Sequence, residues 1–122
     1  MRKKCSVKMN DIIWTVVGVE RDADELDFDG EVVFGLTVYA SLTIFVRAED
    51  VSRDVLRRTI THELVHAAIY SYGYDGSSMN EEAIANFFEC FGEEIMNDSD
   101  FVYGKIRASK PAPMPATNVL WA

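Results

Sequence analysis

The stretch His62-Glu63-Leu64-Val65-His66 combines two histidines and a glutamate inside a segment with the apolar period of an α-helix. Leu56, Ile60 and Leu64 recur every four residues, which predicts one apolar helix face. Since four residues make about one helical turn, both imidazoles project from the same side. Two histidines at this spacing can bind one zinc ion, and Glu63 can reach a water bound to that ion. The chain contains 2 histidines, and both lie in this motif.

The alternative interpretation is that two histidines share a helix face by chance. The surroundings favour a zinc site, because the motif lies in the middle of a predicted helix and an acidic predicted helix comes after it. Catalysis is a separate inference, since it requires an open position at the metal and a base. A helical protein without metal is a further alternative, which a metal assay would test.

The composition indicates one small globular domain. The chain has 122 residues, of which 48% are hydrophobic, enough for a modest core. Its net charge of −8 argues against a nucleic-acid partner, where affinity comes largely from lysine and arginine, and against anionic membranes. We predict a single domain over residues 1–107 and a flexible tail over residues 108–122, which contains three prolines. For Trp121 in that tail, docking on the domain or on a partner is the alternative to an unstructured end. The oligomeric state is not predicted.

The cysteines and the N-terminal residues indicate a cytoplasmic protein. Cys5 lies near a terminus predicted to be mobile and Cys90 in a helix pattern, so we interpret both as reduced thiols, with Cys90 as a small core residue. The basic start could mimic a signal peptide, but polar residues interrupt the apolar stretch that such a peptide needs. The longest apolar run, residues 12–19, is too short to span a membrane.

Three strands are predicted before the motif. Residues 12–20 are rich in β-branched side chains and indicate a buried strand. Residues 21–30 are an acidic turn without the ligand register of a calcium loop, and they end in the turn signal Asp29-Gly30. Residues 31–39 and 41–47 are predicted as two further strands, the second with one buried face.

Two helices are predicted next. The first begins at a cap at Asp50 or Ser52 and runs to about Tyr72, with Gly73 as its stop. The second runs from about residue 80 to 97, and Ser78 and Glu81 have capping-box spacing. Its predicted apolar stripe consists of Ile84, Phe88, Phe91 and Ile95. Residues 101–106 are predicted as a short strand or turn.

A catalytic zinc site usually has a third protein ligand in addition to two histidines. Tyr72 stands where the last histidine of the pattern HExxHxxGxxH would be, which excludes the metzincins. The remaining candidates are Glu81, Glu82, Asp75 and Cys90. From helical phase, Glu81 lies nearer the predicted apolar stripe and Glu82 nearly opposite it.

The motif and the segment Glu82-Ala83-Ile84-Ala85-Asn86-Phe87-Phe88 together resemble the gluzincin arrangement, HExxH followed by Glu-x-x-x-Asp. They also resemble the E-x-x-A-N-x-F pattern of ImmA/IrrE-type metallopeptidases and the small HExxH proteins of phages and prophages. The resemblance covers roughly residues 35–95. It implies that His62, His66 and Glu82 bind Zn²⁺ and that Glu63 is the general base. Asn86 stands where an Asp orients a ligand histidine in thermolysin-like enzymes, and it lacks that charge.

The resemblance further implies an α+β fold, namely a minimal zincin-like domain. About three N-terminal strands, antiparallel or mixed, would pack on the HExxH helix and on a second, Glu-bearing helix. The implied function is a zinc metallopeptidase, a hydrolase acting on a peptide or on few protein targets in a bacterial host cell. By the same resemblance, the strand over residues 41–47 pairs with the extended substrate. The alternative function is a zinc-binding phage or prophage interaction module without turnover.

Overall fold

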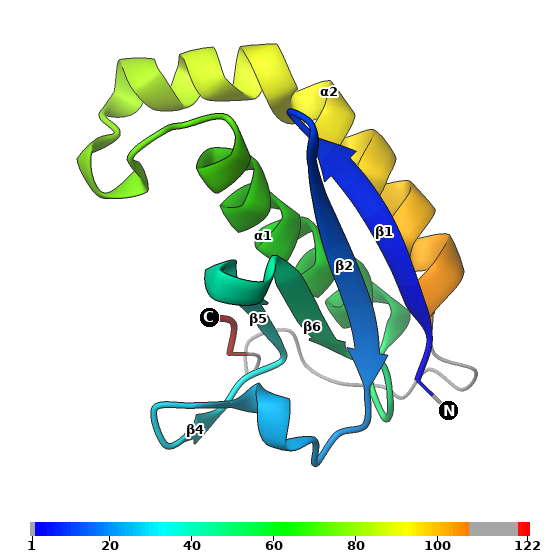
Figure 1. The fold of residues 1–122 in the computed structure, drawn as a ribbon. Helices are drawn as coiled ribbons and strands as arrows, with labels where there is room; N and C mark the ends of the chain where they lie inside the picture. Colours follow the sequence, from blue (N-terminus) through cyan, green and yellow to red (C-terminus); the bar gives the residue numbers. More distant parts are fainter. Residues whose placement is uncertain (1, 108–119) are drawn as a thin grey trace.

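The computed structural model describes residues 2–107 and 120–122 of the chain, which form an α+β fold. Two α-helices cover one face of a four-stranded sheet (Figure 1). The elements are, in order, β1 (Lys4–Met9), β2 (Ile12–Val19), η1 (Asp24–Leu26), β3 (Asp27–Phe28), β4 (Glu31–Val32), β5 (Gly35–Val38), η2 (Tyr39–Ser41), β6 (Thr43–Arg47), α1 (Arg53–Ser71), η3 (Gly76–Ser78) and α2 (Glu81–Ile106). Neither α1 nor α2 is long and apolar enough to cross a membrane, and no other helix of the described ranges is.

The sheet is mixed and has the strand order β1-β2-β6-β5. β2 and β6 run parallel, whereas β1 pairs antiparallel with β2 and β5 pairs antiparallel with β6. A tight turn at Asn10 and Asp11, with φ of 50° and 63°, connects β1 to β2. This is the backbone conformation that two-residue hairpins favour. The topology leaves β1 and β5 as the edge strands, and β5 lies beside α1.

The main core lies between the sheet and the two helices. Its largest side chain is the fully buried Trp14 of β2, whose indole nitrogen donates to Ser71 Oγ at 2.8 Å. The predicted apolar face of α1, with Leu56, Ile60 and Leu64, is buried in this core. Burial of apolar side chains of this size contributes about 1.5–3 kcal/mol each, so this face fixes the orientation of α1 on the sheet.

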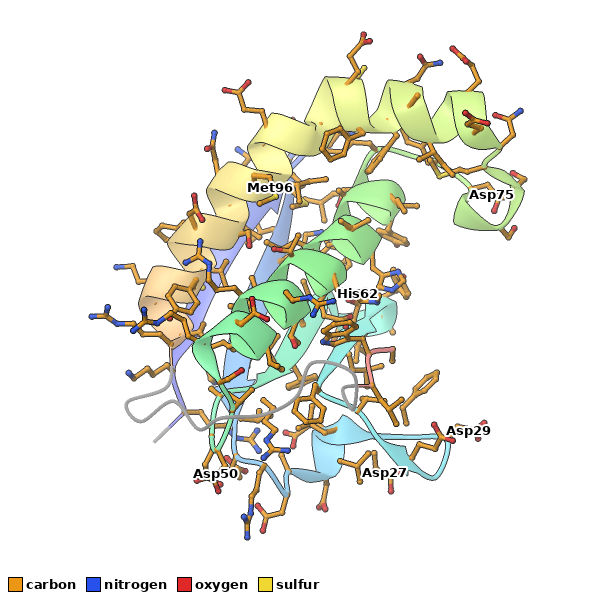
Figure 2. The ribbon with its side chains drawn as sticks, turned by 180° about the vertical axis from the view of Figure 1, so that it is seen from behind. Asp27, Asp29, Asp50, His62, Asp75 and Met96 are labelled. Carbon is orange, nitrogen blue, oxygen red and sulfur yellow. The ribbon has the colours of Figure 1, made fainter. Side chains whose placement is uncertain are left out.

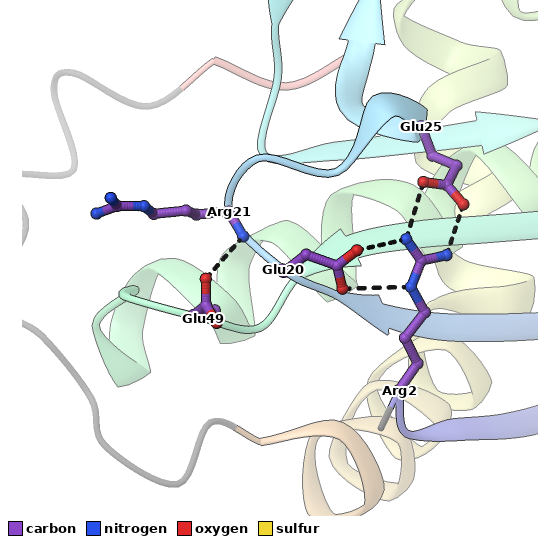
Figure 3. A network of polar contacts seen from close by, with 5 residues as sticks. All are labelled: Arg2, Glu20, Arg21, Glu25 and Glu49. Carbon is purple, nitrogen blue, oxygen red and sulfur yellow. Dashed lines mark hydrogen bonds and ion pairs between the residues drawn. The ribbon is translucent and has the colours of Figure 1, made fainter.

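A second, smaller cluster lies on the opposite face of the sheet, where Leu26 of η1 packs with Val17 and Val19. Next to it, Arg2 forms ion pairs with Glu20 at 2.7 Å and with Glu25 at 2.5 Å (Figure 3). The network connects Arg2, two residues before β1, to the segment after β2. It is partly exposed to solvent, so salt screens it and its contribution to stability is small.

Most of the predicted elements are present. The strand predicted over residues 12–20, the two over residues 31–39 and 41–47, and the first helix correspond to β2, β4–β5, β6 and α1. Ser52 caps α1, since its hydroxyl accepts from the Val55 amide at 3.1 Å. Gly73 follows the helix with φ of 77°, the left-handed conformation that glycine adopts without strain.

Several predictions near the chain ends were wrong. The terminus predicted to be mobile forms β1, in which Val7 and Met9 are buried. The second helix does not end at residue 97, because Val102 and Ile106 bury an apolar face that extends it. The segment predicted as a strand or turn over residues 101–106 is therefore helical. Cys90 is exposed rather than part of the core.

The predicted stripe of α2 was right in its second half and wrong in its first. Phe91 and Ile95 pack in the core, whereas Ile84 and Phe88 are exposed and Phe87 is buried instead. The predicted Ser78–Glu81 capping box is not used either. Asn80 caps the helix, since its side-chain oxygen accepts from the Ala83 amide at 2.9 Å.

Candidate functional site

Both histidines of the motif lie on the side of α1 that residues 120–122 approach. The two imidazole centroids are 5.0 Å apart, as the four-residue spacing predicts. α2 packs elsewhere on α1, where Thr61 Oγ1 and Ser99 Oγ are 2.7 Å apart. Figure 2 shows His62 directed away from α2. The pair is therefore held by one helix and faces the edge of the sheet.

The environment of the two imidazoles favours their neutral form. Burial lowers the pKa of His62, and the neighbouring His66 lowers it further. Burial also lowers the pKa of His66. In both cases a hydrogen bond to the backbone of Ala122 opposes the shift. A metal binds the neutral imidazole, so protons compete with it less here than at an ordinary histidine.

Glu63 is a fully buried carboxyl group between α1 and β5, with 0% of its surface exposed. Thr37 of β5 donates to its Oε1 at 2.8 Å. Its other oxygen, Oε2, has no hydrogen-bond partner among the described residues. Burial raises the pKa of Glu63 to about 8, and the hydrogen bond from Thr37 opposes that shift. The predicted base thus has one oxygen held by Thr37 and one without a partner among the described residues, and without metal it carries a proton below about pH 8. A cation bound by the neighbouring histidines would favour the ionised form, which is the form that accepts a proton.

Gly35 makes this close approach of strand and helix possible. A Cβ atom at this position would lie 2.7 Å from Thr59 Cγ2 and 2.9 Å from both Cγ and Oε2 of Glu63. Those contacts are too short for any side chain. The backbone of β5 therefore lies directly on the carboxyl group, as close backbone approaches generally require glycine.

Residues 120–122 dock on this site. The amide of Phe34 donates to the carbonyl of Leu120 at 2.7 Å, and the amide of Ala122 donates to the carbonyl of Gly35 at 3.2 Å. The indole of Trp121 stacks on the His62 ring, with centroids 5.4 Å apart and an interplanar angle of 23°. The prediction of an unstructured end is therefore wrong for residues 120–122, and docking of Trp121 on the domain, the alternative, is observed. The other predicted tail residues, 108–119, lie outside the described part of the chain.

The edge strand of the sheet beside the histidines is β5, and the prediction that residues 41–47 pair with the substrate was wrong. β6 lies between β2 and β5, so both of its sides are already paired. The backbone of β5 on its outer side is the one that Leu120 and Ala122 contact. The sequence showed two strands before the helix, but their spatial order depends on long-range pairing.

Two tyrosines form the rim of the site beyond His66. Tyr70 follows His66 by one helical turn, and its ring lies 5.2 Å from that of Tyr39 in η2. Burial and the charge of Glu63 raise the pKa of Tyr39, which places this phenol near the carboxyl. Tyr39 comes to the site only through the turn between β5 and β6, so no local sequence pattern indicates its role there. Tyr72, in contrast, donates to Glu94 of α2 at 2.7 Å.

The structure does not bring Glu82 to the histidines. Across residues 2–107 and 120–122, no three side chains of His, Cys, Asp or Glu form a group that could hold a metal ion. The helix pair explains this separation, since Ser99 lies opposite Thr61, next to the motif. Glu82 precedes Ser99 by 17 residues, or about 25 Å of helical rise. Glu82 is exposed at the start of α2 instead.

The other candidates for a third ligand have local roles or face solvent. Asp75 stabilises its own turn, where its Oδ1 accepts from the Ser77 amide at 3.1 Å, and Figure 2 shows it well separated from His62. Glu81 and Asn86 are exposed on the first turns of α2, and Cys90 is exposed further along. The assignment of Glu82 by resemblance therefore stays a prediction that needs its own test.

A metal titration of two neighbouring variants supplies that test. With α2 in the described position, we expect Glu82→Ala and Glu81→Ala to have the zinc affinity of the unmodified chain, because neither carboxylate reaches the histidines. Isothermal titration with zinc measures both. A large loss in Glu82→Ala alone would show that the first turns of α2 move to the motif when metal binds, and Glu81→Ala is the matched control for charge and cap.

The site supplies two of the ligands that a zinc ion needs, the imidazoles of His62 and His66. Two imidazoles held in the neutral form are suitable nitrogen ligands, and the unpartnered Oε2 of Glu63 lies beside the residues that carry them. The third protein ligand is not part of this arrangement within the described ranges. No family model matches the chain, and no curated protein or solved structure is significantly similar to it.

Proposed function

We propose that the chain is a zinc-dependent metallopeptidase with a minimal zincin-like fold, in which Glu63 is the general base. The observation that supports this most is the juxtaposition of three features: the paired imidazoles of His62 and His66, the buried Glu63, and the outer edge of β5, on which residues 120–122 lie in extended form. A hydrolase of peptide bonds needs all three, since it must hold a metal, move a proton and align an extended chain.

His62 and His66 would hold the zinc ion, which when bound polarises the substrate carbonyl and lowers the pKa of water. Residues of the chain would align the substrate and transfer the proton. β5 would align the peptide through the backbone groups on its outer side, in place of residues 120–122. Oε2 of Glu63 accepts a proton from the attacking water, whose oxygen bonds to the carbonyl carbon. The same proton then passes to the leaving nitrogen as the C–N bond breaks, so the carboxylate is regenerated.

Thr37 supports this role of Glu63 by position. Its hydroxyl lies 2.8 Å from Oε1 and 3.3 Å from the Glu63 carbonyl oxygen, and its side chain is buried. With Oε1 occupied, the carboxyl keeps one orientation, and Oε2 is the oxygen left for proton transfer. A base that is held in one orientation accelerates proton transfer more than a mobile one, because its geometry is fixed before the reaction.

A zinc-binding interaction module without turnover is the second candidate. The absence of a third protein ligand near the histidines within the described ranges favours it, because catalytic zinc usually has three. In this case the edge of β5 would bind a peptide and release it unchanged. The residues that contact metal and peptide would be the same, so the two functions differ in the role of Glu63.

The proposed setting is the cytoplasm of a bacterial host cell, with a phage or prophage origin. The two cysteines, Cys5 and Cys90, are free thiols, which fits a reducing compartment. The proposed partner is a peptide or protein substrate rather than a nucleic acid, since the net charge of −8 repels phosphates.

Metal analysis tests the proposal directly. We expect one zinc per chain in protein purified without chelator and without a metal affinity tag. Binding should weaken only below about pH 6.5, the ordinary histidine value, because burial lowers the pKa of both imidazoles. Elemental analysis and melting curves with added zinc measure this. Protein that contains no zinc and melts at the same temperature with zinc added would contradict both candidate functions.

A further inference from the structure

We propose that the surface formed by Arg58, Thr59 and His62 is a subsite for an indole side chain of an extended peptide, and that Trp121 occupies it within the chain itself. This inference deepens the proposed function and rests on it, since it names the class of peptide that the site binds. Its test is a binding measurement on metal-free protein, so the result does not depend on zinc or on hydrolysis.

The backbone of β5 and the residue before it provide the first part of the subsite. The outer edge offers the Phe34 amide as a donor and the Gly35 carbonyl as an acceptor, and residues 120–122 use both. The bonded pairs, 34 with 120 and 35 with 122, advance together, so the two segments run in the same direction. Pairing of this kind recognises any extended peptide, because it uses main-chain groups alone. The selectivity must come from the side chain between the two bonds, which is Trp121.

Three groups of α1 surround the indole. His62 stacks on the ring at 5.4 Å, and the guanidinium carbon of Arg58 lies 5.2 Å from the ring centroid. The indole nitrogen donates to Thr59 Oγ1 at 2.5 Å. Stacking and the cation–π contact select a large aromatic face. The hydrogen bond adds a requirement for a donor at the edge of the ring.

The hydroxyl of Thr59 can only act as an acceptor toward a ligand. Its own proton is donated to the Val55 carbonyl at 2.7 Å, and the side chain is buried. An indole N–H therefore matches the free lone pair, whereas a phenylalanine ring has no donor to offer. This distinguishes tryptophan from the other apolar aromatic residue by chemistry and not only by size.

The residue after the indole is placed at the reactive centre. The amide of Ala122 donates to the carbonyl of Gly35 at 3.2 Å, and Gly35 lies against Glu63 of the motif. A peptide bound in the same way thus has its tryptophan immediately before the residue that lies beside the motif. The occupying segment belongs to the same chain as the subsite, so its binding is intramolecular. A second peptide must compete with it.

The experiment measures binding of a fluorescent peptide, Asn-Val-Leu-Trp-Ala with both ends blocked, to chelator-treated protein by anisotropy. We expect Trp121→Ala to bind it at least about 10-fold more tightly than the unmodified chain, because the internal competitor is removed. In that variant, replacing Trp by Phe in the peptide should weaken binding about 5-fold, through loss of one hydrogen bond. Adding Thr59→Val, which keeps the shape of the side chain, should reduce the preference for Trp over Phe by about the same 5-fold factor, because it removes the hydrogen-bond acceptor.

Two outcomes would overturn the proposal: equal affinity of Trp121→Ala and the unmodified chain, or no preference for the Trp peptide. Trp121→Phe, which keeps the ring, is the milder variant, and it should bind the peptide with intermediate affinity. Circular dichroism melting shows whether each variant is folded. If the Trp preference is found but no hydrolysis ever is, the subsite stands and the peptidase function fails. If hydrolysis occurs but the Trp preference is not found, the peptidase function stands and the subsite proposal fails.

Discussion

Glu63→Gln is expected to fold, to keep its zinc and to lose peptide hydrolysis by about 100-fold or more, the usual scale for a general base. The substitution keeps the shape of the side chain and replaces Oε2, the oxygen without a partner among the described residues, by an amide nitrogen that cannot accept a proton. Thr37 can still donate to the remaining oxygen. The folded structure and the metal ligands are thereby preserved while the base is removed.

The measurement requires a broad substrate set, because an enzyme with few targets would ignore a general protein substrate. Product profiles from a peptide library and from candidate protein partners are compared by mass spectrometry, with zinc content determined in the same samples. His62→Ala is the control for metal dependence and should lose both zinc and activity. If the unmodified chain and Glu63→Gln hold zinc and give identical profiles, the peptidase function is refuted and the interaction module replaces it.

The metal-free protein is expected to lose about 2 kcal/mol of unfolding free energy between pH 5 and pH 7 because of Glu63. Burial raises the pKa of this carboxyl to about 8 in the folded chain, far above the value in an unfolded one. A raised folded pKa stabilises the protein fully below the unfolded pKa, which is about 4.3 for a glutamate. That contribution is lost as the pH rises toward about 8, since the unfolded chain ionises first.

Glu63→Gln isolates this effect from those of other groups. Asp98 also has a pKa raised by burial, and the histidines have lowered ones, but both proteins share these groups. Urea unfolding of chelator-treated samples at pH 5 and 7 should show a steeper decline for the unmodified chain than for the variant. If the unfolding free energy falls equally in both proteins, the Glu63 carboxyl is ionised in the folded state and its surroundings compensate the charge.

Local signals explain which parts of this fold and site could be predicted. The motif, the cap at Ser52 and the stop at Gly73 are short-range features, and each fixes α1 without reference to the rest of the chain. The pairing of His62 with His66 follows from the same helix. Strand propensity likewise located β2 and β6. Their order in the sheet depends on which strands pair, and no local pattern contains that information.

Long-range packing explains why the other predictions were wrong or incomplete. The second helix was predicted to end near residue 97, yet Ser99 is buried against Thr61 and α2 continues to Ile106. That continuation fixes the register of the two helices, and with it the distance between Glu82 and the motif. Tyr39 and the docked Trp121 reach the site only through the tertiary fold.

Gly35 gives this arrangement a mechanical consequence. The strand that offers its outer edge to a peptide rests with its inner side on the Glu63 carboxyl, and no side chain cushions the contact. Any shift of β5 toward α1 upon pairing compresses the space around Oε2, and any shift away opens that space to water. Gly35 contacts both the docked segment, through its carbonyl, and the Glu63 carboxyl. A peptide that pairs with the outer side of β5 therefore also changes the space around Oε2 of Glu63.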